Sequence, residues 1–167
     1  MVKLNLGCGN EHLKGYINID IVPTPATDMV MDCLHLGFKN NSVNKIVAYH
    51  LIEHLTIKEF NKAKREWWRV LKVGGKLVLE CPDLEEVTRL FSESDFDSRW
   101  VVYNNGPPLI RHIYGGQVNP YEFHKSGYSK WLLVRLLGKL YKNFSFGESH
   151  KDYRIPCIHL ECVKRRL

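Results

Sequence analysis

Short apolar runs separated by polar turns recur along the chain. Five of them have the length of strands and are bounded by residues such as Gly, Pro, Asp and His: residues 2–6, 16–21, 29–33, 45–49 and 76–81. Continuous apolar runs of this length are typical of strands that are buried on both faces, as in a parallel sheet. The pattern therefore predicts a largely parallel β-sheet.

A stretch with helical periodicity lies between the fourth and fifth runs. Residues of one helical face recur every three or four positions, and six of the seven are apolar: Ile57, Phe60, Ala63, Lys64, Trp67, Val70 and Leu71. Thr56 followed by Glu59 predicts a capping box at the start, and we expect Gly74-Gly75 to stop the helix. Strand, helix and strand form a βαβ unit, so the predicted fold class is α/β.

The C-terminal part of the chain has a different pattern. We predict a second helix over residues 129–141 and two strands, 143–146 and 155–163, that are close enough to form an antiparallel hairpin. A loop is expected at 104–108, but no repeat or Pro/Gly/Ser-rich linker divides the chain. The prediction is a single domain over 1–167, with an insertion at about 84–128.

The composition excludes several classes of protein. With 167 residues, 44% apolar and 25% charged, the chain is neither disordered, collagen-like nor a coiled coil. Its most apolar stretch, 131–141, is interrupted by Arg135 and Lys139, so we expect no membrane partner. The N-terminus lacks a signal-peptide pattern, which favours a cytoplasmic protein. Five cysteines without a C-x-x-C pair argue against a disulfide framework and a structural zinc site.

The net charge of +6 comes largely from one helix and the C-terminal tail. The basic residues there are Lys58, Lys62, Lys64, Arg65, Arg69, Lys72, Lys164, Arg165 and Arg166. A solvated helix face and an exposed terminus explain them most simply. An RNA-binding surface would add aromatic residues at the ligand edge, whereas at least one of Trp67 and Trp68 is expected in the core. Nucleic acid is thus a disfavoured partner, and the sequence leaves the oligomeric state open.

A glycine-containing turn follows the first predicted strand. Leu6-Gly7-Cys8-Gly9-Asn10 would lie at the carboxyl end of a parallel strand, where open α/β sheets bind ligands. Asp20 and Asp32 are expected at the ends of the next two strands, so one carboxylate could bind ribose hydroxyls and the other an adenine amino group. The third glycine of a dinucleotide pattern is replaced by His12, which disfavours NAD and FAD. Taken singly, these residues also fit an ordinary turn and ordinary strand-end caps.

Taken together, these features resemble the class I S-adenosylmethionine-dependent methyltransferases, especially the branch called methyltransferase domain type 11. The similar segments are Leu4-Asn5-Leu6-Gly7-Cys8-Gly9, Asp20, Asp32, Leu51-Ile52-Glu53-His54-Leu55, and Arg69-Val70-Leu71 before Gly74-Gly75. The resemblance implies a Rossmann-like methyltransferase domain that binds S-adenosyl-L-methionine. The implied cofactor-binding residues are Asn5, Leu6, Gly7, Cys8, Gly9, Asn10, Asp20, Ile21, Asp32, Cys33, Leu34 and His50. Two features depart from the family: residues 10–16 are too few for its usual first helix, and Val73 replaces a common proline.

The segment His50-Leu51-Ile52-Glu53-His54 spells H-x-x-E-H, the zinc motif of inverted-zincin proteases. That motif needs a helix, whereas here only a short turn separates a strand from the helix capped at Thr56, so the protease hypothesis is disfavoured. The segment is also similar to the E-x-x-E-H metal site of some quinone-ring and small-RNA 2′-O-methyltransferases. A divalent metal is therefore an alternative. The simplest role for Glu53 and His54 is a hydrogen-bonded turn, and we assign no metal ligand.

The predicted insertion contains the remaining candidate chemistry. Its Gly115-Gly116-Gln117 and Phe123-His124-Lys125 segments are similar to a stretch of small methyltransferases of uncharacterised substrate. His124, His54 and His50 are the candidate catalytic residues, with His112 as another candidate base, because a hydroxyl acceptor must lose a proton. We expect methyl transfer to an oxygen or nitrogen of a small-molecule or saccharide-like acceptor. The alternative is a non-catalytic module that uses the same fold to bind a ligand or RNA.

Overall fold

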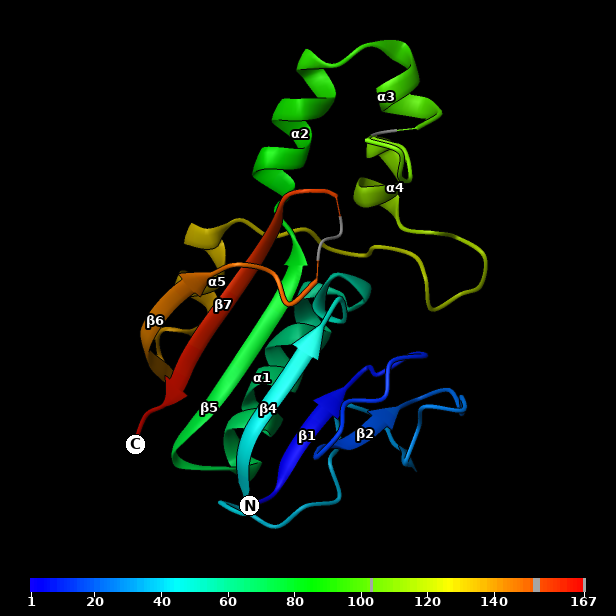
Figure 1. Cartoon of the computed structure of the whole chain (residues 1–167). Helices are drawn as coiled ribbons and strands as arrows, with labels where there is room; N and C mark the ends of the chain where they lie inside the picture. Colours follow the sequence, from blue (N-terminus) through cyan, green and yellow to red (C-terminus); the bar gives the residue numbers. More distant parts are fainter. Residues whose placement is uncertain (103, 152–153, 167) are drawn as a thin grey trace.

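One twisted sheet runs through the molecule, and its strands follow the order β3-β2-β1-β4-β5-β7-β6 (Figure 1). The computed structural model describes residues 1–102, 104–151 and 154–166. The strands are β1 (Lys3–Leu6), β2 (Ile17–Asp20), β3 (Met29–Val30), β4 (Val43–Tyr49), β5 (Leu71–Pro82), β6 (Tyr141–Gly147) and β7 (Cys157–Lys164). The first five are parallel, whereas β7 is antiparallel to both β5 and β6. The predicted α/β class and the C-terminal antiparallel hairpin are confirmed.

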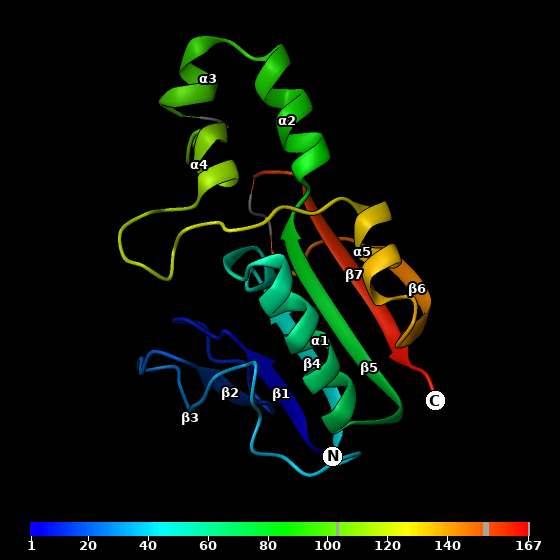
Figure 2. The same cartoon turned by 180° about the vertical axis from the view of Figure 1, so that it is seen from behind.

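The helices lie on one face of the sheet and beyond its upper edge. They are the 3₁₀ helix η1 (Ile52–His54), α1 (Ile57–Val70), α2 (Leu84–Glu93), α3 (Phe96–Trp100), α4 (Leu109–Tyr114) and α5 (Lys130–Leu137). Helices α1 and α5 cover the same face, as the view from behind shows (Figure 2). Helices α2, α3 and α4 extend above the end of β5 (Figures 1 and 2). No helix in the described ranges is both long and apolar enough to cross a membrane.

Helix α1 anchors the core as its periodicity predicts. Thr56 and Glu59 form the expected capping box. Trp67 is fully buried, and its indole N–H donates to the Cys33 carbonyl at 2.9 Å, which ties the connection after β3 to the helix. Lys64 reaches through the apolar face so that its ammonium donates to the Leu136 carbonyl at 2.6 Å. The one charged residue of this face is therefore satisfied by the last turn of α5.

Two boundaries differ from the prediction. Gly74-Gly75 does not stop the helix: α1 ends at Val70, and the glycines lie inside β5, where the register with β4 is interrupted between Val43↔Leu71 and Lys45↔Lys76. A Cβ at Gly75 would lie 2.8 Å from the Lys72 carbonyl oxygen, so the pair permits a strand irregularity. Strand β3 ends at Val30, because the chain then turns and the Asp32 carboxylate accepts from the Leu34 N–H.

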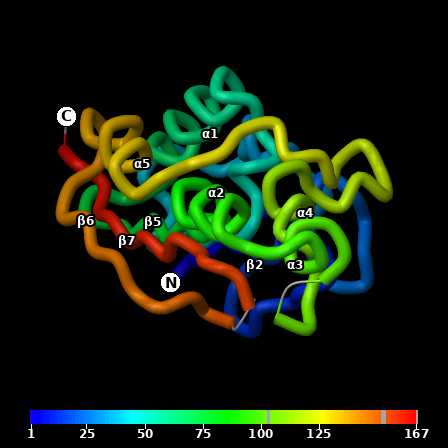
Figure 3. The backbone as a smooth tube through the Cα atoms, turned by 90° about the horizontal axis from the view of Figure 1, so that it is seen from above, coloured from blue at the N-terminus to red at the C-terminus, as the bar shows by residue number. Residues whose placement is uncertain are grey.

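The late helix is shorter than predicted. It begins after the N-cap Ser129 and ends at Leu137, because Tyr141 already belongs to β6, where its buried hydroxyl donates to the Lys64 carbonyl at 3.0 Å. The segment 115–128 runs from α4 to α5 below helices α2 and α3 and above the start of α1 (Figures 2 and 3). It therefore passes over the edge of the sheet at which the parallel strands end.

Candidate functional site

A cavity of about 390 Å³ lies at the carboxyl edge of the sheet, where the strand order reverses between β1 and β4. Its lining comes from the turn after β1, from the end of β4 and from the β6–β7 connection: Asn5, Gly7, Cys8, Asn10, Glu11, Tyr49, His50 and Lys151. A reversal point of this kind is where open α/β sheets bind ligands. The volume is within the range of small-molecule sites, roughly 300–1,000 Å³.

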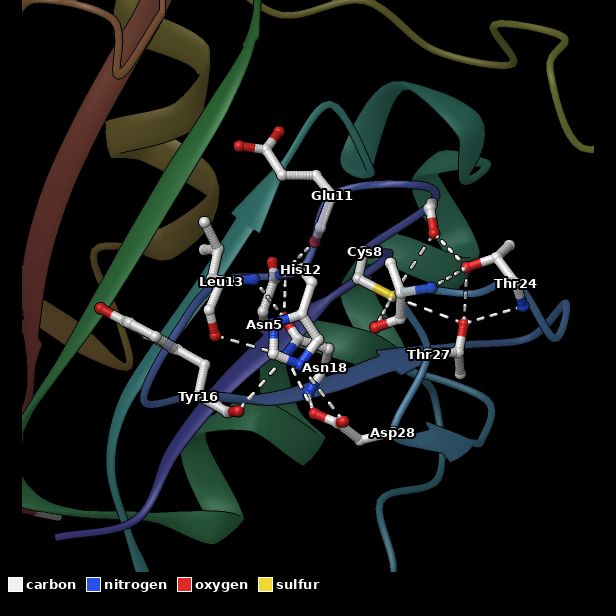
Figure 4. Close-up of polar contacts among 12 residues, drawn as sticks. Asn5, Cys8, Glu11, His12, Leu13, Tyr16, Asn18, Thr24, Thr27 and Asp28 are labelled. Atoms are coloured by element: carbon white, nitrogen blue, oxygen red, sulfur yellow. Dashed lines mark hydrogen bonds and ion pairs between the residues drawn. The ribbon is translucent and has the colours of Figure 1, made fainter.

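Side-chain hydrogen bonds hold the turn in place where a helix would usually follow β1 (Figure 4). Asn18, fully buried on β2, accepts from the Asn5 amide at 3.0 Å and from the Leu13 N–H at 2.9 Å. Its own amide donates to Asp28 at 2.9 Å. No helix forms between residues 7 and 16, all of which are described, as the short segment suggested. The asparagine network supplies the order that a helix would give.

The glycine turn needs glycine at position 7. Gly7 has φ of +66°, and a Cβ there would lie 2.8 Å from the Leu51 Cδ1. The turn is closed by Asp20, whose carboxylate accepts from the Gly9 N–H at 2.8 Å and from the Val22 N–H at 3.0 Å. Each oxygen retains a second lone pair with which it can accept from a ligand hydroxyl.

The structure gathers only part of the predicted cofactor-binding set around this cavity. Asn5, Gly7, Cys8, Asn10 and His50 line it. The remaining predicted residues, Leu6, Gly9, Asp20, Ile21, Asp32, Cys33 and Leu34, are absent from this lining.

These other residues have different surroundings. Leu6 is buried in the core, Ile21 is half exposed, and Leu34 lines a separate hollow beside α1. Burial raises the pKa of the Cys33 thiol to about 12, so it stays protonated near neutral pH. The Asp32 carboxylate holds its own turn by accepting from the Leu34 N–H at 2.8 Å. Asp32 and Leu34 thus form one turn, and the cofactor-binding role of Cys33, Leu34 and Asp32 stays a prediction.

Three residues of the lining are absent from the sequence prediction. The Lys151 ammonium lies 2.6 Å from the Glu11 carboxylate, so a cation and an anion face the cavity together. Tyr49 adds an aromatic ring, which stacks on His150 with centroids 3.8 Å apart. Lys151 follows β6, far from the glycine turn in sequence, and no local motif marks it. Glu11 directly follows the predicted glycine turn and Tyr49 ends the predicted strand 45–49, so both could have been named on that ground.

A buried carboxylate fixes the wall behind this cavity. Glu80 on β5 is fully buried and accepts from the His150 Nδ1–H at 2.8 Å and from the His159 Nδ1–H at 2.7 Å. The Nε2 of His50 lies 3.8 Å from the same carboxylate. Glu80 thus links the end of β5 to the β6–β7 connection and holds Tyr49 and His150 in their stacked arrangement.

A second cavity, of about 190 Å³, lies under the 115–128 segment. It is lined by Glu53, Pro82, Leu84, His112, Ile113, Tyr114, His124, Lys125, Ser126 and Gly127. His50, from the first cavity, donates to the Glu53 Oε1 at 3.0 Å. The linings of the two cavities therefore meet at one hydrogen bond.

His50 is held as a cation by its neighbours. Burial lowers its pKa, but the contacts with Cys157 and Glu53 outweigh burial and raise the pKa to about 10. Its φ of +50° places it in the left-handed region directly after β4, which turns the ring toward Glu53. A histidine that is protonated at neutral pH orients the Glu53 carboxylate and does not accept a proton.

His54 lies beside His124, which lines the second cavity, with ring centroids 4.9 Å apart; His54 itself is not part of that lining. The Nδ1 of His54 is 3.2 Å from the Phe123 carbonyl, and that of His124 is 3.0 Å from the His112 carbonyl. Since a carbonyl only accepts, both Nδ1 atoms carry a proton, and the Nε2 of each ring is the nitrogen left for another partner. Burial lowers the pKa of His124, which favours the neutral ring.

Two buried polar atoms in the second cavity have no hydrogen-bond partner within the described part of the chain. They are the Glu53 Oε2 and the His112 Nε2. Burial lowers the pKa of His112 to about 4, so its imidazole is neutral. Because unsatisfied buried polar groups are costly, their concentration here indicates a place for a ligand.

Comparison with known proteins gives a family and a fold. Residues 4–79 match the family model described as methyltransferase domain. No curated protein matches the sequence. A protein from Pyrococcus horikoshii has 17% identity and a TM-score of 0.67, with 98% of this chain and 81% of that chain covered. An S-adenosylmethionine-dependent methyltransferase from Methanosarcina mazei has 18% identity and a TM-score of 0.61, with coverages of 99% and 92%.

A third solved structure, 1,6-didemethyltoxoflavin-N1-methyltransferase from Burkholderia thailandensis, contains its substrate and S-adenosylhomocysteine. It has 11% identity and a TM-score of 0.61, and the match covers 99% of this chain and 71% of that one. Identities at this level establish the fold. Residues 4–79 match the methyltransferase domain model, and the chain has the fold of solved S-adenosylmethionine-dependent methyltransferases.

Proposed function

We propose that the chain transfers a methyl group from S-adenosylmethionine to an oxygen or nitrogen of a small-molecule or saccharide-like acceptor. The observation that carries the proposal is the His50–Glu53 hydrogen bond of 3.0 Å, at which the linings of the two cavities meet. Methyl transfer needs a donor and an acceptor in adjacent sites, because much of the rate comes from positioning them.

The first cavity fits the cofactor in size and in charge. S-adenosylmethionine ends in an amino acid, whose α-ammonium and α-carboxylate form a zwitterion. Glu11 and Lys151 offer the matching anion and cation on one side of the cavity. The Gly7 turn leaves room for the main chain of the protein to approach a ligand closely. Residues Glu11, Lys151, Gly7 and Tyr49 would therefore hold the methionine part.

The second cavity suits an acceptor that donates hydrogen bonds. Its Glu53 Oε2 and His112 Nε2 are buried acceptors without a protein partner in the described chain. Hydroxyl and amine groups supply the donors that these atoms lack. This complementarity supports a polyhydroxylated or amine-bearing acceptor.

The reaction needs little from the protein beyond alignment and removal of a proton. The cofactor, when bound, supplies an electrophilic methyl on a sulfonium: an acceptor lone pair forms the new bond as the S–C bond breaks, and the bonding electrons remain on sulfur. His50 orients Glu53 toward the acceptor. The acceptor proton is directed to the Nε2 of His112, a buried acceptor without a protein partner in the described chain.

Named relatives of this fold support a small acceptor. The Burkholderia enzyme named above acts on 1,6-didemethyltoxoflavin, as its name states, and another structure of this fold, with a TM-score of 0.62 at 11% identity, is a methylating domain of a citrinin polyketide synthase. Both names point to small organic acceptors for those proteins. We extend that class to this chain because its second cavity holds only about 190 Å³.

Ligand binding and methyl transfer test the proposal in sequence. S-adenosylhomocysteine at 100 times its dissociation constant should raise the free energy of unfolding by about 2.7 kcal/mol, whereas NAD should not. Transfer of a radiolabelled methyl group from S-adenosylmethionine should then be detected with at least one member of a panel of sugars, polyols and small amines. Absence of S-adenosylhomocysteine binding at millimolar concentration would contradict the proposal. Binding with salt-sensitive RNA association and no transfer would favour the non-catalytic alternative.

A further inference from the structure

Three side chains with metal-binding atoms converge at the second cavity. Glu53, His54 and His124 each offer one ligand atom, and these atoms all lie within 4.8 Å of one another. Glu53 and His54 belong to η1, whereas His124 comes from the segment between α4 and α5. The grouping is therefore produced by the fold.

Both histidines are oriented as metal ligands usually are. Histidines that bind a metal through one ring nitrogen commonly donate the other N–H to a carbonyl or carboxylate, which fixes the ring and its tautomer. His54 donates its Nδ1–H to the Phe123 carbonyl at 3.2 Å, and His124 donates its own to the His112 carbonyl at 3.0 Å. The Nε2 of each ring is therefore the nitrogen left for another partner.

The carboxylate between them has one satisfied and one unsatisfied oxygen. Glu53 is buried; its Oε1 accepts from His50, while its Oε2 has no hydrogen-bond partner among the described residues. An anionic oxygen left this way is costly unless a cation or a donor reaches it. Glu53 lines the second cavity together with His124. A cation at this position would satisfy the Oε2.

The two segments that carry the ligands are fastened to each other. The Glu53 carbonyl accepts from the N–H groups of Lys125, at 2.8 Å, and Ser126, at 3.2 Å. The Ser126 hydroxyl lies 2.8 Å from the Leu55 carbonyl, and a ring nitrogen of His54 is bound to the residue before His124. These contacts hold His124 against η1 without any help from a bound ion, so the site is built before it is filled.

We propose that Glu53, His54 and His124 bind one divalent transition-metal ion at the second cavity. Two imidazoles and one carboxylate suit Zn²⁺, Co²⁺, Mn²⁺ or Fe²⁺ better than Mg²⁺ or Ca²⁺. Ligand atoms about 2.1 Å from a tetrahedral ion are roughly 3.4 Å apart, so atoms that lie within 4.8 Å of one another approach by at most about 1.4 Å on binding. With three protein ligands, such an ion would keep a further coordination position, at which it would polarise an acceptor hydroxyl.

His50 has a different part in this site from the one suggested by sequence similarity. The H-x-x-E-H segment aligns it with the first glutamate of E-x-x-E-H metal sites, yet its Nδ1–H is bound to Glu53 at 3.0 Å. His50 is therefore a positioning residue that fixes the ligand carboxylate. The third ligand is His124, seventy positions after His54, which no local motif in the sequence identifies.

Cobalt binding tests the site without reference to catalysis. Chelator-treated full-length protein is titrated with Co²⁺, and visible absorption and calorimetry are recorded. We expect one equivalent to bind with d–d bands typical of mixed nitrogen and oxygen ligands. Glu53→Gln, His54→Ala and His124→Ala should each weaken binding by more than about 100-fold, and His50→Gln by about 10–100-fold, the usual effect of losing a residue that orients a ligand. His12→Ala, at a histidine paired with Asp28 on the surface, is the control and should bind as the unchanged protein does.

The folded state of each variant is checked so that a lost site is not confused with a lost fold. The metal-free variants should retain the circular dichroism of the unchanged protein, and if His124→Ala does not, His124→Asn replaces it. Binding of Co²⁺ that is unaffected by Glu53→Gln and His124→Ala would overturn the proposal, as would no stoichiometric binding at millimolar Co²⁺. S-adenosylhomocysteine affinity, measured in parallel, separates this result from the proposed methyl transfer, because the metal ligands do not line the first cavity.

Discussion

The two cavities share a wall but differ in how their buried polar groups are satisfied. Around the glycine turn, Asn5, Asn18 and Asp28 are bonded to one another and to the backbone. In the second cavity, the Glu53 Oε2 and the His112 Nε2 have no partner in the described chain. Buried polar groups that are hydrogen-bonded to one another stabilise the fold and fix the conformation of the turn. Buried polar groups without partners cost stability, and such a cost is typical of sites that bind a ligand. Mutations that remove polar groups should therefore act differently on the two sides.

The largest effect is expected for Asn18→Leu. This change removes the partner of the Leu13 N–H, the Asn5 amide and Asp28, all within 3.0 Å of the Asn18 amide group, and leaves buried polar groups unsatisfied. We expect a loss of about 3–5 kcal/mol in the free energy of unfolding, measured by urea denaturation with tryptophan fluorescence. Asn61→Leu on α1 is the control, with less than about 1 kcal/mol expected. Equal losses in the two variants would contradict the structural role of the network.

A smaller loss is expected for Gly7→Ala, because the turn needs a left-handed residue with no side chain. Both Gly7, at φ +66°, and Gly15, at φ +83°, would strain an alanine, at about 1–2 kcal/mol each. Only at Gly7 does the added Cβ meet a neighbour, Leu51 at 2.8 Å, whereas Gly15 has open space. Gly7→Ala should therefore lose about 1 kcal/mol more than Gly15→Ala and also bind S-adenosylhomocysteine more weakly. Indistinguishable denaturation midpoints and affinities would show that Leu51 simply moves aside.

Much of the satisfied region is predictable from sequence, because its signals are local. The capping box of Thr56 and Glu59, the apolar face of α1 and the glycine turn each depend on spacings of a few residues. Local signals can also mislead. Gly74-Gly75 has the pattern of a helix stop but belongs to β5, since pairing of Leu71 with Val43 starts the strand as soon as α1 ends. Tertiary pairing outweighed the local preference of the glycines.

The rest of the site depends on contacts between distant segments and has no local signal. Lys151 reaches Glu11 only because β7 lies between β5 and β6, so that the β6–β7 connection returns to the edge of β4 and β1. His124 meets His54 only because the 123–126 segment binds the backbone of η1. Asp32 illustrates the reverse case: it was expected at a strand end, but β3 stops at Val30 and the carboxylate holds a turn.

Lys151→Met should weaken cofactor binding by about tenfold, or about 1.4 kcal/mol, an effect smaller than those of the two folding variants. The lost ammonium is the proposed partner of the α-carboxylate, and Glu11 then faces the cavity without its partner at 2.6 Å. Calorimetry with S-adenosylhomocysteine should show the loss, whereas 5′-methylthioadenosine, which lacks the amino-acid end, should bind equally to both proteins. Lys142→Met on the exposed part of β6 is the matched control. Equal weakening of the binding of both ligands would show that Lys151 does not act through the amino-acid end of the cofactor.

His112→Leu is expected to change stability least. It tests the comparison between the two regions most directly because, like Asn18→Leu, it replaces a buried polar side chain by an apolar one, here at the second cavity. Its Nε2 is buried without a partner in the described chain, and burial lowers the pKa of the ring to about 4. Burial of the native histidine therefore already reduces the free energy of unfolding. Leucine removes that cost but also the ring's contact with the Pro107 backbone. The two changes oppose each other, and the free energy of unfolding should shift by less than about 1 kcal/mol in either direction.

Methyl transfer, in contrast, should fall while S-adenosylhomocysteine affinity is retained, because His112 lines only the second cavity. A loss of stability as large as that of Asn18→Leu would mean that both cavities are held together in the same way and that unpaired polar groups do not mark the acceptor site.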